Sequence, residues 1–350
     1  METKQILHFY SPKYRKDSIK AVLLLFIALS MVFSGCSTKE DIKIGFLYSS
    51  DITYRFVVES NYFAERAAQL GAEVIIDHAD NNAALQYEKA VEMKEQGVDM
   101  LVLIYINEIT ANAIVRDYKA EGIPVMAYNR LIPNSDIDMY IAGNNRSLGE
   151  NMAGYVLNRA PRGNYMLFGG DKFDRNAIEL QAAIDSVLAP SIENGSINIL
   201  YKTFTENWDG RNAAYELRQF MQNSEQYPDA IIACFDGMAH HMIEVLKDWD
   251  LDGKAIITGQ DAQIESVRDI AAGKQHITMY HPFKEIGYTA AEVAIALIKG
   301  ERLDDFNVVY TDNGLKEVPT VQINSIPVTR DNLDMVLIQG GVYTRDEVYR

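Results

Sequence analysis

Polar and aromatic side chains stand shortly after the predicted strands of this 350-residue chain. Apolar patterns place the ends of these strands near residues 48, 104, 128, 168, 203, 234, 259 and 280. The candidates that follow them are Arg55, Phe56, Asn107, Asn129, Arg130, Asp174, Asn176, Trp208, Phe235, Asp236, Asp261 and His281. Ligands of open α/β sheets bind at the carboxyl ends of the strands, so we expect these side chains to surround a site.

The set mixes planar hydrogen-bonding groups with large aromatic rings, and that mixture suits a sugar ring. Neighbouring sugar hydroxyls are donor and acceptor pairs that fit Arg, Asp and Asn, while the C–H faces of the ring pack on aromatic side chains. A structural alternative is that Arg55, Asp174 and Asp261 are helix caps and surface ions, because Asp and Asn are favoured at turns. Capping does not explain two arginines in one half of the chain and Trp208 in the other.

Signatures of catalysis are weak, and we expect no enzyme, no metal and no cofactor. The sequence contains neither a phosphate-binding loop, nor a dinucleotide fingerprint, nor a nucleophile elbow. His240 and His241 lack a Glu at the spacing that a zinc protease needs, so they indicate a solvated helix face. Asp174 and Asp261 as a glycosidase pair would make a hydrolase, which is the weakest alternative.

Composition sets the outer limits on function. Lys and Arg number 33 against 49 Asp and Glu, and the net charge of −16 disfavours a nucleic-acid partner. Two cysteines cannot form a disulfide framework, and their spacing with His matches no structural zinc pattern. Apolar residues make up 48% of the chain, which is enough for two domain-sized cores.

The N-terminal segment predicts export. A basic stretch precedes the uncharged run 21–33, which is too short for a bilayer-spanning helix and typical of a signal peptide. The run ends at Ser34, Gly35 and Cys36, which resembles the lipobox of bacterial lipoproteins, with Cys36 as the lipidated residue. An ordinary signal peptide with an incidental cysteine and an uncleaved anchor are the alternatives. Cys234 lies on an apolar run and is expected in the core.

From residue 41 onward, strand-length apolar runs alternate with helical patterns. Runs at 42–48, 72–77, 100–104 and 124–128 alternate with helices, and runs at 164–168, 197–203, 230–234 and 255–259 repeat that rhythm. The segment EQGVDMLVLI (95–104) also parallels EQYPDAIIAC (225–234) at an offset of 130 residues. The pattern predicts two tandem lobes, each with a doubly wound parallel sheet.

The segment after His281 is too short for a third domain, so we expect it to return and cover both lobes. The chain would then cross between the lobes several times, forming a hinge with a ligand cleft between the lobes. We expect a signal peptide at 1–36, a first lobe from 37–146 with 283–318, and a second lobe from 147–282 with 319–350.

Several long strings carry a family resemblance. They are GIPVMAYNRLI (122–132), DIDMYI (136–141), GNYMLFGG (163–170), ITGQD (257–261), IAAGKQ (270–275) and DNGLKEVP (312–319). The region from Gly45 to Val321 resembles the D-xylose-binding proteins of bacterial ABC importers. That resemblance implies the type I periplasmic binding protein fold and a monomeric receptor that closes around one monosaccharide.

Six positions match the sugar contacts of that family, namely Arg55, Arg130, Asp174, Asn176, Trp208 and Asp261. Three positions depart from the family. Asn129 stands where the family usually has Asp, Phe235 where it has Asn, and His281 where it has Lys. Phe235 removes an amide that would pair with a sugar hydroxyl, so xylose itself is uncertain and a deoxy sugar or another pentose is an alternative.

The resemblance implies an exported protein, either a lipoprotein anchored to the cell membrane or a periplasmic receptor, that hands a xylose-like aldose to an ABC permease. Hinge closure would bring the contacts of the two lobes around the sugar. The alternative output is a sugar sensor that signals to a histidine kinase or chemoreceptor without transport. Genes for a permease or a kinase beside this one would separate the two.

Overall fold

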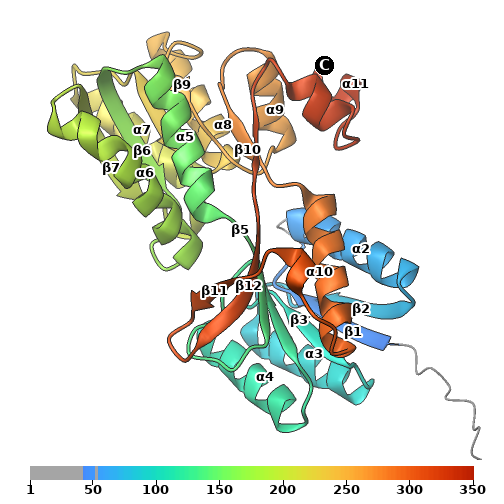
Figure 1. Cartoon of the computed structure of the whole chain (residues 1–350). Coiled ribbons are helices and arrows are strands. Elements are labelled where there is room, and N and C mark those ends of the chain that lie inside the picture. Colours follow the sequence, from blue (N-terminus) through green and yellow to red (C-terminus); the bar gives the residue numbers. More distant parts are fainter. Residues whose placement is uncertain (1–41, 52–53) are drawn as a thin grey trace, which may run out of the picture. The chain divides into compact units, whose positions relative to one another are not determined.

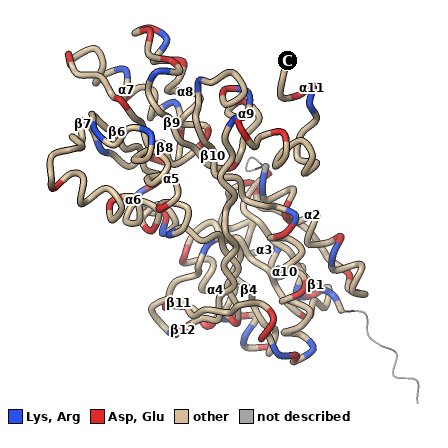
Figure 2. Tube along the Cα trace, turned by 45° about the horizontal axis from the view of Figure 1, so that its top comes forward, with Lys and Arg blue, Asp and Glu red and all other residues tan. Residues whose placement is uncertain are grey.

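The computed structural model describes residues 42–51 and 54–350 (Figure 1). The expected signal peptide and Cys36 lie outside the described residues. No helix in the described ranges is long and apolar enough to cross a membrane. Acidic and basic residues are interspersed along the described chain (Figure 2). Cys234 is buried as expected, and burial raises the pKa of its thiol to about 12.

The first lobe is built on a seven-stranded sheet with the order β11-β12-β5-β4-β3-β1-β2. Its strands are β1 (Ile42–Tyr48), β2 (Ala72–His78), β3 (Met100–Leu103), β4 (Val125–Tyr128), β5 (Met139–Gly143), β11 (Val309–Asp312) and β12 (Glu317–Ile323). All neighbours are parallel except β11 and β12. The four strands predicted before residue 130 are confirmed to within a few residues.

Helices cover both faces of this sheet because successive side chains of a strand point to opposite sides. Phe46 packs with α2 (Tyr54–Gln69) and α10 (Phe283–Ile298), and Leu47 packs with α3 (Ala83–Glu95) and α4 (Glu108–Ala120). Burial on both faces explains why these strands read as continuous apolar runs.

The second lobe is built on a four-stranded parallel sheet with the order β7-β6-β8-β9. Its strands are β6 (Gly163–Gly169), β7 (Ile197–Phe204), β8 (Ala230–Ala233) and β9 (Ile256–Ile257). Helices α5 (Asn145–Arg159) and α6 (Arg175–Glu193) cover one face, and α7 (Gly210–Asn223) and α8 (Asp236–Leu246) cover the other.

The internal repeat is visible in the hydrogen bonds of the two sheets. The Asp99 N–H donates to the backbone oxygen of Lys43 at 2.7 Å, and its carboxylate accepts from the Lys43 N–H at 2.8 Å. Asp229, 130 residues later in the chain, makes the same pair of bonds with Asn164, at 2.8 and 2.7 Å. Both aspartates therefore fix the start of a strand against its neighbour, which is why the repeated motif retains them.

The remaining elements lie mainly toward the C-terminus. Short strands β10 (Thr278–Tyr280) and β13 (Ile326–Val328) pair antiparallel. Buried side chains of β10 and β13 pack with α9 (Ile264–Ala271), α11 (Arg345–Val348) and the π-helix η4 (Asp334–Ile338). Three single turns complete the described part, η1 (Glu206–Trp208), η2 (Lys247–Trp249) and η3 (Asp304–Phe306).

The described chain passes between the lobes three times, after β5, after β10 and after β12. The crossing segments touch, because the Asn144 side chain donates to Asn324 at 3.0 Å and the His281 ring lies 3.1 Å from the Ser325 hydroxyl. The last crossing differs from the expected boundary after residue 318. β12 stays paired with β5 as far as Ile323 opposite Gly143, and its buried residues Val318, Val321 and Ile323 pack in the cores of the first lobe.

Candidate functional site

An ion pair joins the two lobes at the carboxyl ends of their strands. Arg55, at the start of α2, places Nη1 3.4 Å from Oδ1 of Asp261, which follows β9 in the second lobe. His281 Nε2 lies 3.4 Å from the same carboxylate oxygen. The structure thus brings together three predicted residues that are far apart in the sequence.

Burial decides the protonation of this group. His281 is 3% exposed, and burial, helped by the charge of Arg55, lowers the pKa of its ring well below the ordinary value. Burial also raises the pKa of Asp261, while Arg55 opposes that shift. A neutral imidazole beside Asp261 can offer one N–H or one lone pair to a ligand hydroxyl.

Arg55 is also held by Glu59, a buried carboxylate that the sequence analysis did not single out. Arg55 donates from Nε and Nη2 to Oε1 of Glu59, at 3.1 and 2.9 Å. Burial raises the pKa of Glu59, whereas the Arg55 guanidinium and the Tyr128 phenol oppose the shift. The spacing of Arg55 and Glu59 could have predicted this pair, because residues four apart share one face of a helix.

A second contact between the lobes lies at the end of β4. Asn176 donates from Nδ2 to the backbone oxygen of Asn129 at 3.0 Å, and its own Oδ1 accepts from Asn145 at 3.0 Å. Asp174 caps α6 by accepting from the Asn176 N–H at 2.9 Å. Its other oxygen accepts from Nε1 of Trp208 at 3.3 Å.

Trp208 and Phe235 form an aromatic corner in the second lobe. Their ring centroids are 6.4 Å apart with the planes at 82°, an edge-to-face contact. A Cβ at Gly170 would lie 2.2 Å from the Trp208 ring, so only glycine leaves room for the indole there. Both rings are partly exposed and can offer an apolar surface to a ligand.

Three of the predicted residues adopt left-handed backbone conformations, with φ of +60° at Asn129, +57° at Trp208 and +88° at Asp261. Asn and Asp tolerate this region, but for a bulky aromatic residue it is uncommon. Such outliers persist only where the surroundings impose them, and they gather at ligand sites.

The remaining candidates have structural partners. Arg130 donates from Nη1 to the Tyr105 backbone oxygen at 3.2 Å and stays partly exposed. The side-chain oxygen of Asn107 caps α4 by accepting from the Thr110 N–H at 2.9 Å. Phe56 lies in the core of the first lobe at 3% exposure. The residue type alone does not show whether such a side chain caps a helix, packs in the core or contacts a ligand.

Asp236 is fully buried and is engaged on both oxygens. Oδ1 accepts from the Gln275 amide, and Oδ2 accepts from the Gln263 N–H and the Thr278 hydroxyl, each at 2.9 Å. The carboxyl group therefore ties α8 to the segments on either side of α9, including the loop that carries Asp261. These bonds account for its conformation without a ligand.

This carboxyl group should make stability depend on pH. Burial raises the pKa of Asp236 to about 8, against about 3.9 for an unperturbed aspartate. Between these values the folded state holds a proton that the unfolded state has released, so stability falls as pH rises from about 4 to 8. Urea unfolding at several pH values should show this slope in the wild type and a flatter one in Asp236→Asn. Equal slopes of stability against pH in the two proteins would contradict this prediction.

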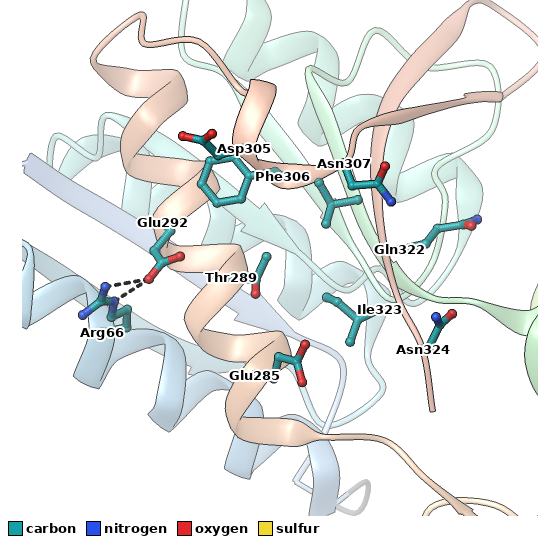
Figure 3. A pocket seen from close by; sticks show the side chains of 11 residues that line it. Arg66, Glu285, Thr289, Glu292, Asp305, Phe306, Asn307, Gln322, Ile323 and Asn324 are labelled. Atoms are coloured by element: carbon teal, nitrogen blue, oxygen red, sulfur yellow. Dashed lines mark hydrogen bonds and ion pairs between the residues drawn. The ribbon is translucent and has the colours of Figure 1, made fainter. Parts of the chain in front are cut away.

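A separate hollow of about 700 Å³ lies on the first lobe, between α10, η3 and β12 (Figure 3). Glu285, Thr289 and Glu292 line it from α10, and Arg66 pairs with Glu292 at its rim. It contains none of the predicted ligand contacts and takes residues from one lobe. We therefore place the candidate site at the strand ends, where side chains of both lobes converge. No cluster of three or more metal-ligating side chains occurs among the described residues.

Comparison with known proteins agrees with this architecture. Residues 44–302 match the family model described as the periplasmic binding protein domain. The D-xylose-binding periplasmic protein of Haemophilus influenzae is 31% identical over 331 residues, covering 95% of this chain and 99% of the relative. The protein of the same name from Escherichia coli is 32% identical, with coverage of 94% and 99%.

Among solved structures, an ABC transporter solute binding protein from Clostridium phytofermentans, with bound β-D-glucose, superposes with a TM-score of 0.79. The two chains are 23% identical, and the match covers 87% of this chain and 99% of the other. At that identity the likeness concerns the fold: two α/β lobes with parallel sheets, joined by crossing segments.

Proposed function

This chain belongs to the periplasmic binding protein family together with the D-xylose-binding proteins, and on that premise we propose that it is an exported receptor for a monosaccharide. It binds a xylose-like aldose between its lobes and delivers the sugar to an ABC importer. The relatives are named for binding rather than for a reaction, and we assign no catalytic step to the site.

The observation that carries the proposal is the pairing of Arg55 with Asp261 across the lobes, 206 residues apart in the chain. Both side chains are ionisable and largely buried, at 11% and 18% exposure. Sugar hydroxyls lying against this pair would accept from the guanidinium and donate to the carboxylate. Such a ligand contacts both lobes only when they are close together, so binding would favour the closed arrangement.

The same site offers the other contacts that a pyranose needs. Trp208 supplies an apolar face, while Asp174 and Asn176 supply hydrogen-bonding groups beside it. Arg130, held by the Tyr105 carbonyl, supplies a second cation from the first lobe. A hydrogen bond to a charged group contributes about 1.5–3 kcal/mol, so a few such contacts suffice for micromolar binding.

The identity of the sugar depends on Asn129, Phe235 and His281. Phe235 faces Trp208 with a ring that cannot pair with a hydroxyl, and His281 carries no charge at neutral pH. These features favour a sugar with one less hydroxyl on that edge than xylose, such as a deoxy sugar, or another pentose stereoisomer.

Calorimetry with a panel of aldopentoses, aldohexoses and deoxy sugars tests the proposal. We expect at least one monosaccharide to bind and to raise the melting temperature, since a ligand that binds only the folded state stabilises it. If no monosaccharide binds, the proposed function is wrong. Sugar uptake in cells that lack the gene then tests delivery to the importer, and normal uptake would favour a sensor.

Truncating the aromatic corner should weaken binding strongly. Trp208→Ala removes the apolar face and the donor to Asp174, and we expect at least a tenfold loss of affinity with the fold retained. Trp249→Ala is the matched control, because that indole lies in η2, after the C-terminal end of α8, and its ring is 6.0 Å from the Arg218 guanidinium carbon. Wild-type affinity in Trp208→Ala would remove this residue from the site.

We propose in addition that Cys36 carries a lipid that holds the receptor on a membrane. The uncharged run 21–33 and the Ser34-Gly35-Cys36 sequence support this proposal. Cys36→Ala should leave the membrane fraction of cells, whereas Cys234→Ala should remain in it. Unchanged partitioning of the Cys36→Ala variant would contradict lipid anchoring.

A further inference from the structure

Glu59 is a carboxylate with no exposed surface, on helix α2 of the first lobe. It stands one helical turn after Arg55, between Phe56 and Phe63 of the same core. The neighbouring helix holds the backbone in place, because a Cβ at Gly287 of α10 would lie 2.7 Å from the Glu59 carbonyl oxygen. Glu59 therefore offers no surface to a ligand in this arrangement of the lobes, and the close helix contact leaves its position little freedom.

The contact with Arg55 is directional. One oxygen, Oε1, accepts from both Nε and Nη2, so Glu59 occupies one edge of the guanidinium fork. The rings of Phe56 and Phe283 lie 6.0 and 5.9 Å from the guanidinium carbon. Because Nε and Nη2 are taken by Glu59, Nη1 is the nitrogen left to face Asp261 in the second lobe.

We propose that Glu59 is a positioning residue: it aims Arg55 at the ligand and thereby sets the affinity of the receptor without contacting the sugar. The inference rests on the proposed function, since Arg55 must be a ligand contact. An arginine side chain has many rotamers, and ordering one at the moment of binding costs affinity. A guanidinium that is held beforehand avoids that cost, because its side-chain entropy is lost when the protein folds.

The competing explanation is that Glu59 only neutralises a buried cation. A purely structural ion pair would change the melting temperature when broken, but it would not change affinity through Arg55. The two explanations predict different coupling between the effects of the Glu59 and Arg55 substitutions on affinity. If Glu59 positions Arg55, replacing Glu59 has no further effect on affinity once Arg55 has been replaced.

A double-mutant cycle separates them, with affinity measured by calorimetry for D-xylose, L-arabinose, D-ribose, D-glucose and their deoxy analogues. We expect Glu59→Gln to weaken the tightest of these sugars about tenfold. We expect Arg55→Lys to weaken it further, and the double variant to bind no more weakly than Arg55→Lys alone. Glu292→Gln is the matched control. Glu292, on α10, pairs with Arg66, which lies on α2 like Glu59 but away from the site (Figure 3).

Additive losses, or unchanged affinity with a lowered melting temperature in Glu59→Gln, would overturn the inference while leaving the receptor function intact. A wild type that binds none of these sugars would overturn the proposed function instead. In that case the Nε–H signal of Arg55 in NMR still tests the positioning. We expect it to be protected from exchange with water in the wild type and exposed in Glu59→Gln, and equal protection would refute the role of Glu59.

Discussion

Arg55→Ala is expected to weaken monosaccharide binding at least about 100-fold and to destabilise the fold. The guanidinium offers charge-assisted hydrogen bonds to a ligand, and losing two of them costs about 3–6 kcal/mol. The same change leaves Glu59 without its partner inside the first lobe. Removing one member of a buried ion pair typically costs about 3–5 kcal/mol of stability.

Calorimetry of sugar binding and urea unfolding at pH 7 measure the two effects separately. Arg66→Ala is the matched control, because Arg66 lies on the same helix and pairs with Glu292 at a partly exposed position. We expect it to bind sugar like the wild type and to lose less than about 1 kcal/mol of stability. A folded Arg55→Ala variant with wild-type affinity would exclude Arg55 from the site.

Phe235→Asn is expected to raise the affinity for D-xylose about 5- to 150-fold. Phe235 stands at the start of α8 in an edge-to-face contact with Trp208, at the position where the resemblance to the D-xylose-binding family predicts an amide. A hydroxyl left unpaired in a closed site costs about 1–3 kcal/mol, and the amide would recover that energy. The affinity for a sugar with an apolar edge should fall in the same variant.

The measurement compares D-xylose with deoxy sugars in the wild type and in Phe235→Asn. Phe173→Asn serves as the control, because Phe173 is 86% exposed in the loop before α6. It should leave both affinities unchanged. Equal gains for every sugar, or no gain for xylose, would show that Phe235 does not select the ligand.

Local patterns in the sequence predicted most of the secondary structure. The strand β1 lies at the predicted residues, and Gly71, Gly97 and Gly122 adopt the positive φ expected at helix ends. The repeat between Asp99 and Asp229 also corresponds to two equivalent strand contacts. Such features depend on neighbours in the chain and on burial of both faces of each sheet, and both are visible in residue order.

Other assignments depended on contacts that residue order does not contain. The boundary of β12 shifted to Ile323 because its partner, β5, lies about 180 residues earlier. Asp236 was expected at the site by its place after a strand, yet Gln263, Gln275 and Thr278 take up its carboxyl group. Phe56 stands next to Arg55 in the chain and still turns into the core, because adjacent residues of a helix face different ways.

The sequence by itself therefore determined the class of fold, the two tandem lobes, the family and the strand ends at which side chains gather. Only the tertiary structure decided which of those side chains meet across the lobes. Arg55 pairs with Asp261, and Glu59 holds Arg55 from within the core. The physical reason is that periodicity reports which face of an element is buried, whereas an ion pair between lobes depends on where the chain crosses between two sheets.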